Sequence, residues 1–296
     1  MSSSLNRNIF PAADGAEAKK MIIAINTDCI KADLKSALNC ISESGFHHLI
    51  WSWHWNDDYL FTPEDILLTR RLLTERELSI TNIHGSCGNG TDHDDHGCGW
   101  YLADPRRRAA GVALVINRLQ YMDSLGIRGA LTLHVPCFND LQDETLRKRV
   151  TVHRDMTRRS LDEVMPYLIK YDIPLALENM PHDNYEVLTS YMNDYPEEYV
   201  GLTCDTGHAN IAGKTGDFYR LKSRVRALHI NDNDGISDQH QIPGDGNVNW
   251  DEVTRHIAAM PLCDGKLEFE LSIAAEQLPE AFERCSNFAE NYFPGR

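Results

Sequence analysis

The chain has 296 residues, and 44 acidic against 29 basic side chains give it a formal net charge of −15 and a pI near 5.2. An acidic balance disfavours a nucleic-acid partner, and no apolar run approaches the ~18 residues of a membrane span, so we expect neither a nucleic acid nor a membrane as partner. The eight cysteines include no C-x-x-C pair, which indicates neither a disulfide framework nor a thiolate zinc site and favours reduced thiols in the cytoplasm.

We expect the first 20 residues to be a flexible, polar leader, because they lack the apolar core of a signal peptide. From residue 21 to residue 296 we expect one folded domain, because no linker or low-complexity tract interrupts this part. Eight short apolar runs in it have the length and composition of fully buried strands. They are residues 21–26, 47–52, 79–84, 129–134, 175–178, 201–205, 227–229 and 267–270.

Stretches of helical periodicity alternate with these strands. Thr62 before Pro63 and Asp104 before Pro105 are typical of an N-cap followed by a first-turn proline. The predicted helices are residues 33–44, 62–77, 104–125, 143–170, 183–194, 216–224, 250–259 and 278–291. Eight strand–helix units in roughly 275 residues match one single-domain (β/α)8 TIM barrel of the α/β class. An open doubly wound sheet would have a Gly-rich turn after its first strand, which the segment after Asn26 lacks.

The residue at the carboxyl end of each strand is a candidate for the active site, because catalytic residues of such barrels come from these ends. The eight are Asn26, Trp51, His84, His134, Glu178, Asp205, His229 and Glu270. A lone buried histidine is often a satisfied core residue, whereas three carboxylates and an imidazole are costly to bury without a partner. Glu178, Asp205, His229 and Glu270 therefore predict one divalent metal site.

Three carboxylates and one imidazole form an oxygen-rich ligand set that suits Mn²⁺ or Mg²⁺ and also admits Co²⁺ or Zn²⁺. Mn²⁺ is the cofactor that we expect. A divalent cation that grips a carbonyl oxygen and the adjacent hydroxyl oxygen acts as a Lewis acid, which stabilises the product of proton removal α to the carbonyl. A carboxylate can be the base for that step.

Four segments resemble the metal-site motifs of the xylose isomerase-like barrels, a family that includes sugar isomerases, ketose 3-epimerases, inosose dehydratases and endonuclease IV. The segments are LALENMP (175–181), GLTCDTGHANIAG (201–213), LHINDNDGISDQHQIPGDGNVNW (228–250) and LEFEL (267–271). The combination of D-T-G-H, H-x-N-D-N-D-G and P-G-x-G-x-x-x-W is specific. It is most similar to the sugar phosphate isomerase/epimerase branch.

The resemblance implies that Glu178, Asp205, His229 and Glu270 are the metal ligands and that His208 contacts substrate. Glu178 and Glu270 would also be the catalytic pair, one removing a proton from a substrate carbon and the other returning a proton to the opposite face. The implied activity is that of a metal-dependent sugar isomerase or epimerase that works through a metal-bound enediolate. We expect a small sugar as partner and a homo-oligomeric enzyme.

Other features narrow the substrate. No lysine ends a strand, which argues against a Schiff-base aldolase, and the chain has no G-x-S-x-G or Walker motif. No Gly-rich phosphate turn follows the last two strands, so a non-phosphorylated keto-sugar or keto-glycoside is favoured. Trp53, in the run WSWHW after the second strand, could stack on a sugar ring, although rim packing or a subunit contact explains it as well.

The main rival function is that of an endonuclease IV-like phosphodiesterase with three zinc ions. Each of that family's nine ligands has a match: His84, His134, Glu178, Asp205, His208, His229, Asp238, His240 and Glu270. In the sugar branch His84, His134 and His240 line the substrate pocket instead. Two more alternatives stay open, a lyase that acts on a keto-inositol or a 3-keto-glycoside with the same metal site, and a catalytically silent barrel that senses a sugar.

Overall fold

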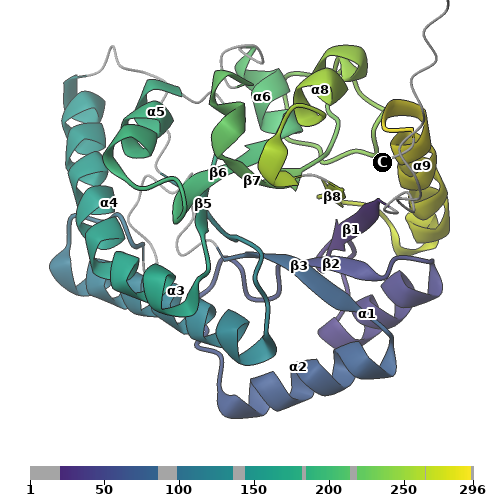
Figure 1. Cartoon of the computed structure of the whole chain (residues 1–296), viewed down its shortest axis with the longest axis horizontal. Coiled ribbons are helices and arrows are strands. Elements are labelled where there is room, and N and C mark those ends of the chain that lie inside the picture. Colours follow the sequence, from purple (N-terminus) through teal and green to yellow (C-terminus); the bar gives the residue numbers. More distant parts are fainter. Residues whose placement is uncertain are drawn as a thin grey trace, which may run out of the picture.

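The computed structural model of the protein describes residues 21–85, 99–135, 144–181, 185–213, 219–263 and 265–294. Eight parallel strands form a nearly closed barrel in the order β7-β6-β5-β4-β3-β2-β1-β8, with the helices outside it (Figure 1). The predicted single-domain (β/α)8 barrel is therefore confirmed. The predicted leader, residues 1–20, lies outside the described residues.

All eight predicted strands form close to their expected bounds. The strands are β1 (Ile22–Asn26), β2 (His48–Trp51), β3 (Ser79–His84), β4 (Leu131–Leu133), β5 (Leu175–Glu178), β6 (Val200–Asp205), β7 (Val225–His229) and β8 (Lys266–Phe269). The α-helices are α1 (Leu34–Glu43), α2 (Pro63–Glu75), α3 (Pro105–Leu125), α4 (Glu144–Tyr171), α5 (Tyr185–Asp194), α6 (Thr206–Ala212), α8 (Trp250–Ile257) and α9 (Leu278–Tyr292). Short 3₁₀ helices are η1 (Tyr219–Arg224), η2 (Pro261–Cys263) and η3 (Ala275–Gln277).

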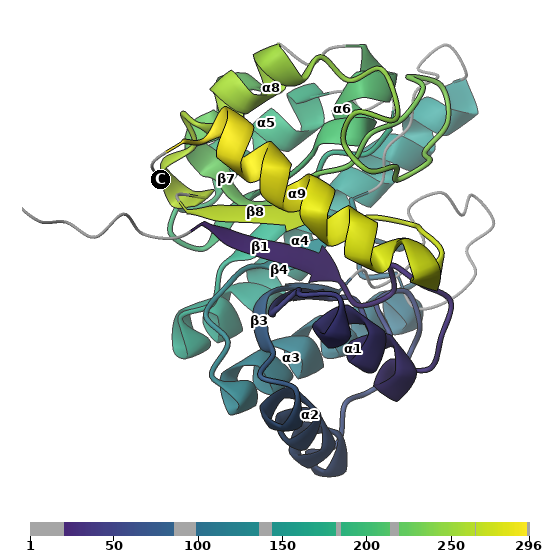
Figure 2. The same ribbon diagram turned by 90° about the vertical axis from the view of Figure 1, so that its right-hand side faces the viewer.

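The barrel closes where β1, the first strand, pairs with β8, the last (Figure 2). Backbone bonds beyond the end of β7 link it to β8: Ile230 N donates to Glu268 O at 2.8 Å, and Glu270 N donates to Ile230 O at 3.1 Å. Asn26 adds a further link, since its side-chain amide accepts from Leu271 N at 2.8 Å and donates to Leu271 O at 3.2 Å. The backbone on both sides of Glu270 is therefore fixed.

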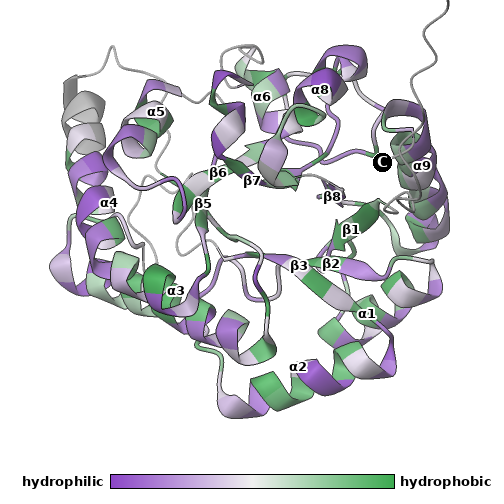
Figure 3. Cartoon of the chain, viewed as in Figure 1, coloured by the Kyte–Doolittle hydropathy of each residue, from purple (hydrophilic) through white to green (hydrophobic). Residues whose placement is uncertain are grey.

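The helices begin where the sequence provides N-caps. Thr62 and Asp65 form a capping box, and Asp104 accepts from the backbone N–H groups of Arg106 and Arg107. Such caps satisfy donors that have no partner in the first turn. Hydrophobic and hydrophilic residues alternate along α1 and α2 (Figure 3), as expected of helices that cover a sheet with one face. Among the described residues, no helix combines the length and apolar character that crossing a membrane requires.

One predicted helix was wrong in type and place. The pattern predicts a helix over residues 216–224, but Tyr219–Arg224 form the 3₁₀ helix η1, and residues 214–218 lie outside the described part of the chain. The α-helix in this part is α6, which follows β6 without a spacer. Asp205 caps it by accepting from His208 N at 2.6 Å, and Gly213 ends it in a left-handed conformation. The last residue of a strand thus also begins a helix, which periodicity alone does not reveal.

Inside the barrel, side chains alternate inward and outward along each strand. One inward layer contains the buried alanine cluster of Ala130, Ala176 and Ala227. The carboxylate of Glu268 on β8 is also buried and accepts a hydrogen bond from the side chain of Asn82 on β3. Two residues further along β5, β7 and β8, the inward positions are predicted metal ligands, so the barrel's own periodicity brings them together.

The loop between β7 and α8 folds around one buried carboxylate, Asp232, which is 0% exposed. Its oxygens accept from the backbone N–H groups of Gly244 at 2.8 Å and Val248 at 3.0 Å, and from the indole N–H of Trp250 at 2.9 Å. Gly246 passes so close that a Cβ there would lie 2.3 Å from Asp232 Oδ1. The N-D-N-D-G and P-G-x-G-x-x-x-W runs therefore shape this loop by enclosing one carboxylate.

Replacing Asp232 with alanine would leave these three donors without their acceptor. We expect Asp232→Ala to lower the free energy of unfolding by about 3–5 kcal/mol, measured by urea denaturation. Asp234→Ala is the matched control, because Asp234 is exposed and the N–H groups it accepts from, those of Ile236 and Ser237, can bond to water. Its loss should be below ~1 kcal/mol. Equal losses in the two variants would contradict a central role for Asp232.

Candidate metal centre

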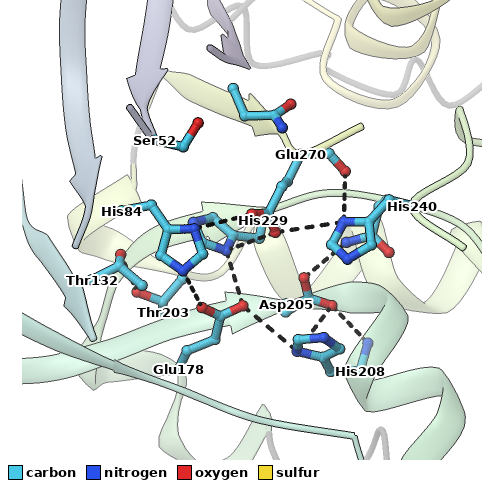
Figure 4. Close-up of polar contacts among 12 residues, drawn as sticks. Ser52, His84, Thr132, Glu178, Thr203, Asp205, His208, His229, His240 and Glu270 are labelled. Carbon is cyan, nitrogen blue, oxygen red and sulfur yellow. Dashed lines mark hydrogen bonds and ion pairs between the residues drawn. The ribbon is translucent and has the colours of Figure 1, made fainter. Parts of the chain in front are cut away.

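The four predicted ligands meet at the carboxyl end of the barrel (Figure 4). Glu178 ends β5, Asp205 ends β6, His229 ends β7, and Glu270 follows β8 directly. Each offers one ligand atom, and these atoms all lie within 4.8 Å of one another. Glu178, Asp205 and His229 are 0% exposed and Glu270 is 7% exposed. The structure thus brings the whole predicted set together in a buried cluster that could hold a metal ion.

Two imidazoles link the two glutamates of this cluster. His229 Nδ1 lies 3.0 Å from Glu178 Oε1 and 3.1 Å from Glu270 Oε2. His84, at the end of β3, lies with Nε2 3.4 Å from Glu178 Oε2 and with Nδ1 3.2 Å from Glu270 Oε1. Each glutamate therefore directs one oxygen at His229 and the other at His84.

Burial and these pairs together set the ionisation states. Burial opposes a charge on Glu178, but His229, His134 and His84 together hold the pKa of Glu178 well below its ordinary value. Burial also opposes a charge on Glu270, yet His229 and His84 hold the pKa of Glu270 well below its ordinary value. Both glutamates are therefore carboxylates at neutral pH, the form that binds a cation or accepts a proton.

Beside the four predicted ligands, the donor atoms of His84, His134 and Glu178 also have a spacing that fits a cation. His84 Nε2 and His134 Nε2 lie 3.0 Å apart, and Glu178 Oε2 is 3.4 Å from the first and 3.2 Å from the second. Ligand atoms 2.0–2.2 Å from a common ion lie roughly 3–3.5 Å from one another. Glu178 Oε2 is buried and, in the described structure, accepts no hydrogen bond of good geometry, as expected of an oxygen placed for a metal. Carboxylates and imidazoles suit Mn²⁺, Mg²⁺, Co²⁺ or Zn²⁺.

Asp205 is fixed by residues just beyond neighbouring strand ends. Asn231 Nδ2 donates to Asp205 Oδ2 at 2.8 Å, and the Asn179 amide bonds to the backbone N–H and C=O of Asp205, both at 2.8 Å. Gly207 of the D-T-G-H run allows this approach, because a Cβ there would lie 1.9 Å from Asn231 Oδ1. Burial raises the pKa of Asp205 to about 6. The sequence analysis did not identify Asn179 and Asn231, although Asn179 directly follows Glu178 and Asn231 lies two residues after His229 in the matched motifs.

A second group of potential ligands, His208, Asp238 and His240, lies beside the first. His208 Nε2 is 3.1 Å from Asp238 Oδ2, and His240 Nε2 is 3.2 Å from Asp238 Oδ1. Against the effect of burial, Asp238 raises the pKa of His240 to about 10. His240 has a φ of +49°, in the left-handed region that residues other than glycine rarely adopt. Residues with such strained backbone conformations cluster at functional sites.

A third group, His84, His134 and Glu178, is covered by Trp55. The indole of Trp55 stacks on His84 with ring centroids 4.8 Å apart and lies edge-on to His134 at 5.5 Å. Burial lowers the pKa of His134, which favours the neutral imidazole that ligates metals. Residues of all three groups line one cavity of about 280 Å³, small for a ligand-binding site.

The predicted substrate-binding residues divide in two. His84, His134, His208 and His240 line the cavity, whereas Trp53 does not. Trp53 is partly buried against the core and edge-on to His54. The tryptophan in the cavity wall is Trp55, and its loop is held by the buried Arg118, which donates to the carbonyl oxygens of His54 and Asp57. The WSWHW pattern did not distinguish the two, because both tryptophans follow the same strand.

A family model described as xylose isomerase-like TIM barrel matches residues 41–287, a range that contains β2 to β8 and every ligand of the candidate centre. The chain belongs to this family. The match confirms the resemblance that the D-T-G-H and P-G-x-G-x-x-x-W motifs indicated.

Known relatives and structures agree with this assignment. An uncharacterized Sinorhizobium fredii protein, y4fM, is 29% identical over 245 residues, which are 76% of this chain and 77% of the relative. A D-tagatose 3-epimerase-like protein has a TM-score of 0.73 at 22% identity and covers 92% of this chain and 98% of its own. A 3-keto-D-glucoside 4-epimerase from E. coli has a TM-score of 0.68 at 16% identity, and the match covers 90% of this chain and 100% of the epimerase. At these identities the likeness shows a fold shared with sugar epimerases.

Metal binding at the central cluster should stabilise the fold. At a free Mn²⁺ concentration 100 times Kd, binding adds ~2.7 kcal/mol to the unfolding free energy, which raises the melting temperature of metal-stripped protein by on the order of 5 °C. Asp205→Ala removes one ligand and should abolish this rise in a thermal-shift assay. Elemental analysis of the loaded wild type should find about one ion per chain, as expected of one oxygen-rich ligand set.

Asp155→Ala is the control, because Asp155 is exposed on the outer helix α4. It should keep both the thermal shift and the ion content of the wild type. A full shift in Asp205→Ala would contradict the ligand assignment. Three zinc ions per chain would extend binding to the two neighbouring groups and favour the rival hydrolase.

Proposed function

We propose that the protein is a divalent-metal-dependent sugar isomerase or epimerase that acts by proton abstraction α to a carbonyl group. The observation that carries this proposal is the pair of ionised carboxylates, Glu178 and Glu270, that line one small cavity and share one cation position. The epimerases of similar fold support the reaction class. As substrate we propose a non-phosphorylated keto-sugar or keto-glycoside.

The glutamates account for both proton transfers. One carboxylate removes the proton from the carbon beside the carbonyl, which leaves an enediolate, and the other returns a proton to the opposite face of that carbon. Because both glutamates are ionised at the start, the second must receive a proton before it can give one. His84 faces Glu178 and Glu270 with its two ring nitrogens, so it lies where it can give a solvent-derived ring proton to one glutamate and take up the proton that the other has removed.

The rest of the cavity serves binding. His208 and His240, which we propose to contact the substrate, lie in its wall with their Nε2 atoms directed at Asp238, and the indole of Trp55 offers an apolar surface to a sugar ring. When bound by the four ligands, the ion, for which we propose Mn²⁺, supplies a Lewis acid that stabilises negative charge on the substrate's carbonyl oxygen.

A metal-dependent phosphodiesterase is the second candidate. The observation that favours it is that all nine endonuclease IV-type residues belong to groups with the spacing of metal ligands. The net charge of −15 opposes it, and the residues that line the described cavity include no lysine or arginine to bind a phosphate backbone. A lyase that acts on a keto-inositol or a 3-keto-glycoside would begin with the same proton abstraction as the epimerase.

Proton abstraction predicts hydrogen exchange with solvent. During turnover of D-tagatose or D-fructose in deuterated water, the Mn²⁺-loaded protein should replace the hydrogen on the reacting carbon with deuterium, which proton NMR measures. A hydride shift would keep the original hydrogen. Full retention at normal turnover would remove the acid and base roles of Glu178 and Glu270 and leave them as ligands.

The glutamates should be needed for catalysis more than for folding. Glu178→Gln and Glu270→Gln keep the side-chain size and one ligating oxygen but cannot take up a proton, so each should lower kcat by about 10²-fold to 10⁴-fold. Circular dichroism should show an intact fold, and Asp155→Asn should behave as the wild type. Activity that survives in Glu178→Gln would refute the mechanism.

A substrate panel separates the candidate functions. It contains ketohexoses, keto-inositols, 3-keto-glycosides and abasic-site DNA, each tested with the Mn²⁺-loaded wild type and both glutamine variants. Turnover of any sugar that depends on Glu178 supports the proposal. Cleavage of the DNA without activity on any sugar would favour the phosphodiesterase.

A further inference from the structure

One carboxylate in the cavity wall, Asp28, has no part in the metal centre or in the proton transfers. It lies two residues beyond β1. Its Oδ1 accepts from Asn26 Nδ2 at 2.8 Å and from the hydroxyl of Ser52. Ser52 is itself fixed, because its N–H donates to Thr27 Oγ1 at 2.9 Å and its Oγ accepts from Asp28 N at 3.2 Å. The ends of β1 and β2 therefore hold Asp28 in one orientation.

The other oxygen of Asp28 is available to a ligand. Within the described ranges, no group donates a hydrogen bond to Oδ2, and no basic side chain forms an ion pair with Asp28, which is exposed. Asp232, by contrast, uses both carboxylate oxygens to accept from its own loop. A carboxylate that is fixed through one oxygen and open through the other can accept a charge-assisted hydrogen bond from a bound molecule.

Asp28 and His208 both line the cavity that Glu178 and Glu270 line. Figure 4 shows Ser52, the hydroxyl partner of Asp28, across the ligand cluster from His208. A molecule that fills this cavity with its reacting carbon between Glu178 and Glu270 would therefore meet Asp28 as well as His208.

The negative charge of Asp28 decides which group of a substrate can lie against it. A hydroxyl group donates to a carboxylate, whereas a phosphate or carboxylate group is repelled by it. The residues that line the described cavity include no lysine or arginine that would offset this repulsion. Its imidazoles His84 and His240 already face the carboxylates Glu178, Glu270 and Asp238. The end of the substrate that meets Asp28 must then carry hydroxyls and no negative charge.

We propose that Asp28 is a specificity-determining residue, which accepts a hydrogen bond from a hydroxyl at one end of an uncharged sugar and excludes sugars phosphorylated at that end. This rests on the proposed function and defines its substrate class as uncharged polyhydroxylated ketones. Asn26 and Ser52 act through Asp28 as positioning residues.

The test compares D-fructose and D-tagatose with their 1- and 6-phosphates. Deuterium exchange by NMR and binding by calorimetry are measured for the Mn²⁺-loaded wild type, Asp28→Asn and the control Asp155→Asn. The wild type should act on the free ketoses and reject at least one ester of each. Asp28→Asn should lower kcat/KM for the free ketoses by about 10-fold to 100-fold, mainly through KM, and admit the rejected ester.

A second variant separates orientation from charge. Ser52→Ala removes the hydroxyl that fixes the carboxylate but keeps its charge, so it should weaken binding of the free ketoses and still reject the ester. Ester binding by Ser52→Ala as tight as its free-ketose binding would contradict exclusion by charge. Equal melting temperatures of the variants and the wild type show that the fold is intact.

The outcomes distinguish this proposal from the proposed function. Unchanged turnover of free ketoses by Asp28→Asn, or a wild-type preference for both esters, overturns the role of Asp28 while Glu178-dependent exchange still supports the epimerase. If the wild type neither binds nor exchanges any ketose, free or phosphorylated, the proposed function fails and the role of Asp28 fails with it.

Discussion

The burial of three carboxylates at one end of the barrel is the constraint on which the rest of the structure depends. Taking each charge out of water costs several kcal/mol, and the chain offsets this only where an opposite charge and hydrogen-bond donors converge. Glu178 and Glu270 obtain both from His229 and His84. The Asp205 carboxylate accepts from the Asn231 amide and from the backbone N–H of His208, whose imidazole Nδ1 lies further away at 3.7 Å. This unequal support fits a cluster that could hold a cation better than a self-sufficient ion-pair network.

The surrounding architecture can be understood as support for that cluster. Asn26 fixes the backbone after Glu270, and Asn231 orients Asp205, so the residues next to the strand ends determine where the ligands point. Asp232 does the same at longer range, because the loop folded around it carries Asp238 and His240 of the second ligand group. Ligand positions that depend on such partners are held more precisely than positions on unsupported loops.

The sequence predicted the barrel and the convergence of its four central ligands because strand ends obey a simple periodicity. A buried parallel strand is a short apolar run, and its last inward residue faces the same space as those of its neighbours. Features that depend on the path of a loop were not accessible in this way. Trp53 and Trp55 differ by one strand period, yet the loop held by Arg118 places only Trp55 against the cavity. Asp28 was missed because it lies beyond the strand end.

The ligand set does not by itself distinguish a sugar enzyme from a phosphodiesterase, because the same imidazoles and carboxylates can bind ions or substrate hydroxyls. The charge of the remaining cavity wall is a better discriminator. A phosphodiester needs cationic partners beyond the ions themselves, whereas the described wall adds the carboxylate of Asp28 and no lysine or arginine. An uncharged polyol can donate a hydrogen bond to that carboxylate, whereas a phosphate would be repelled by it. The wall therefore supports the proposed sugar substrate, even though His208, Asp238 and His240 have the spacing of ligands.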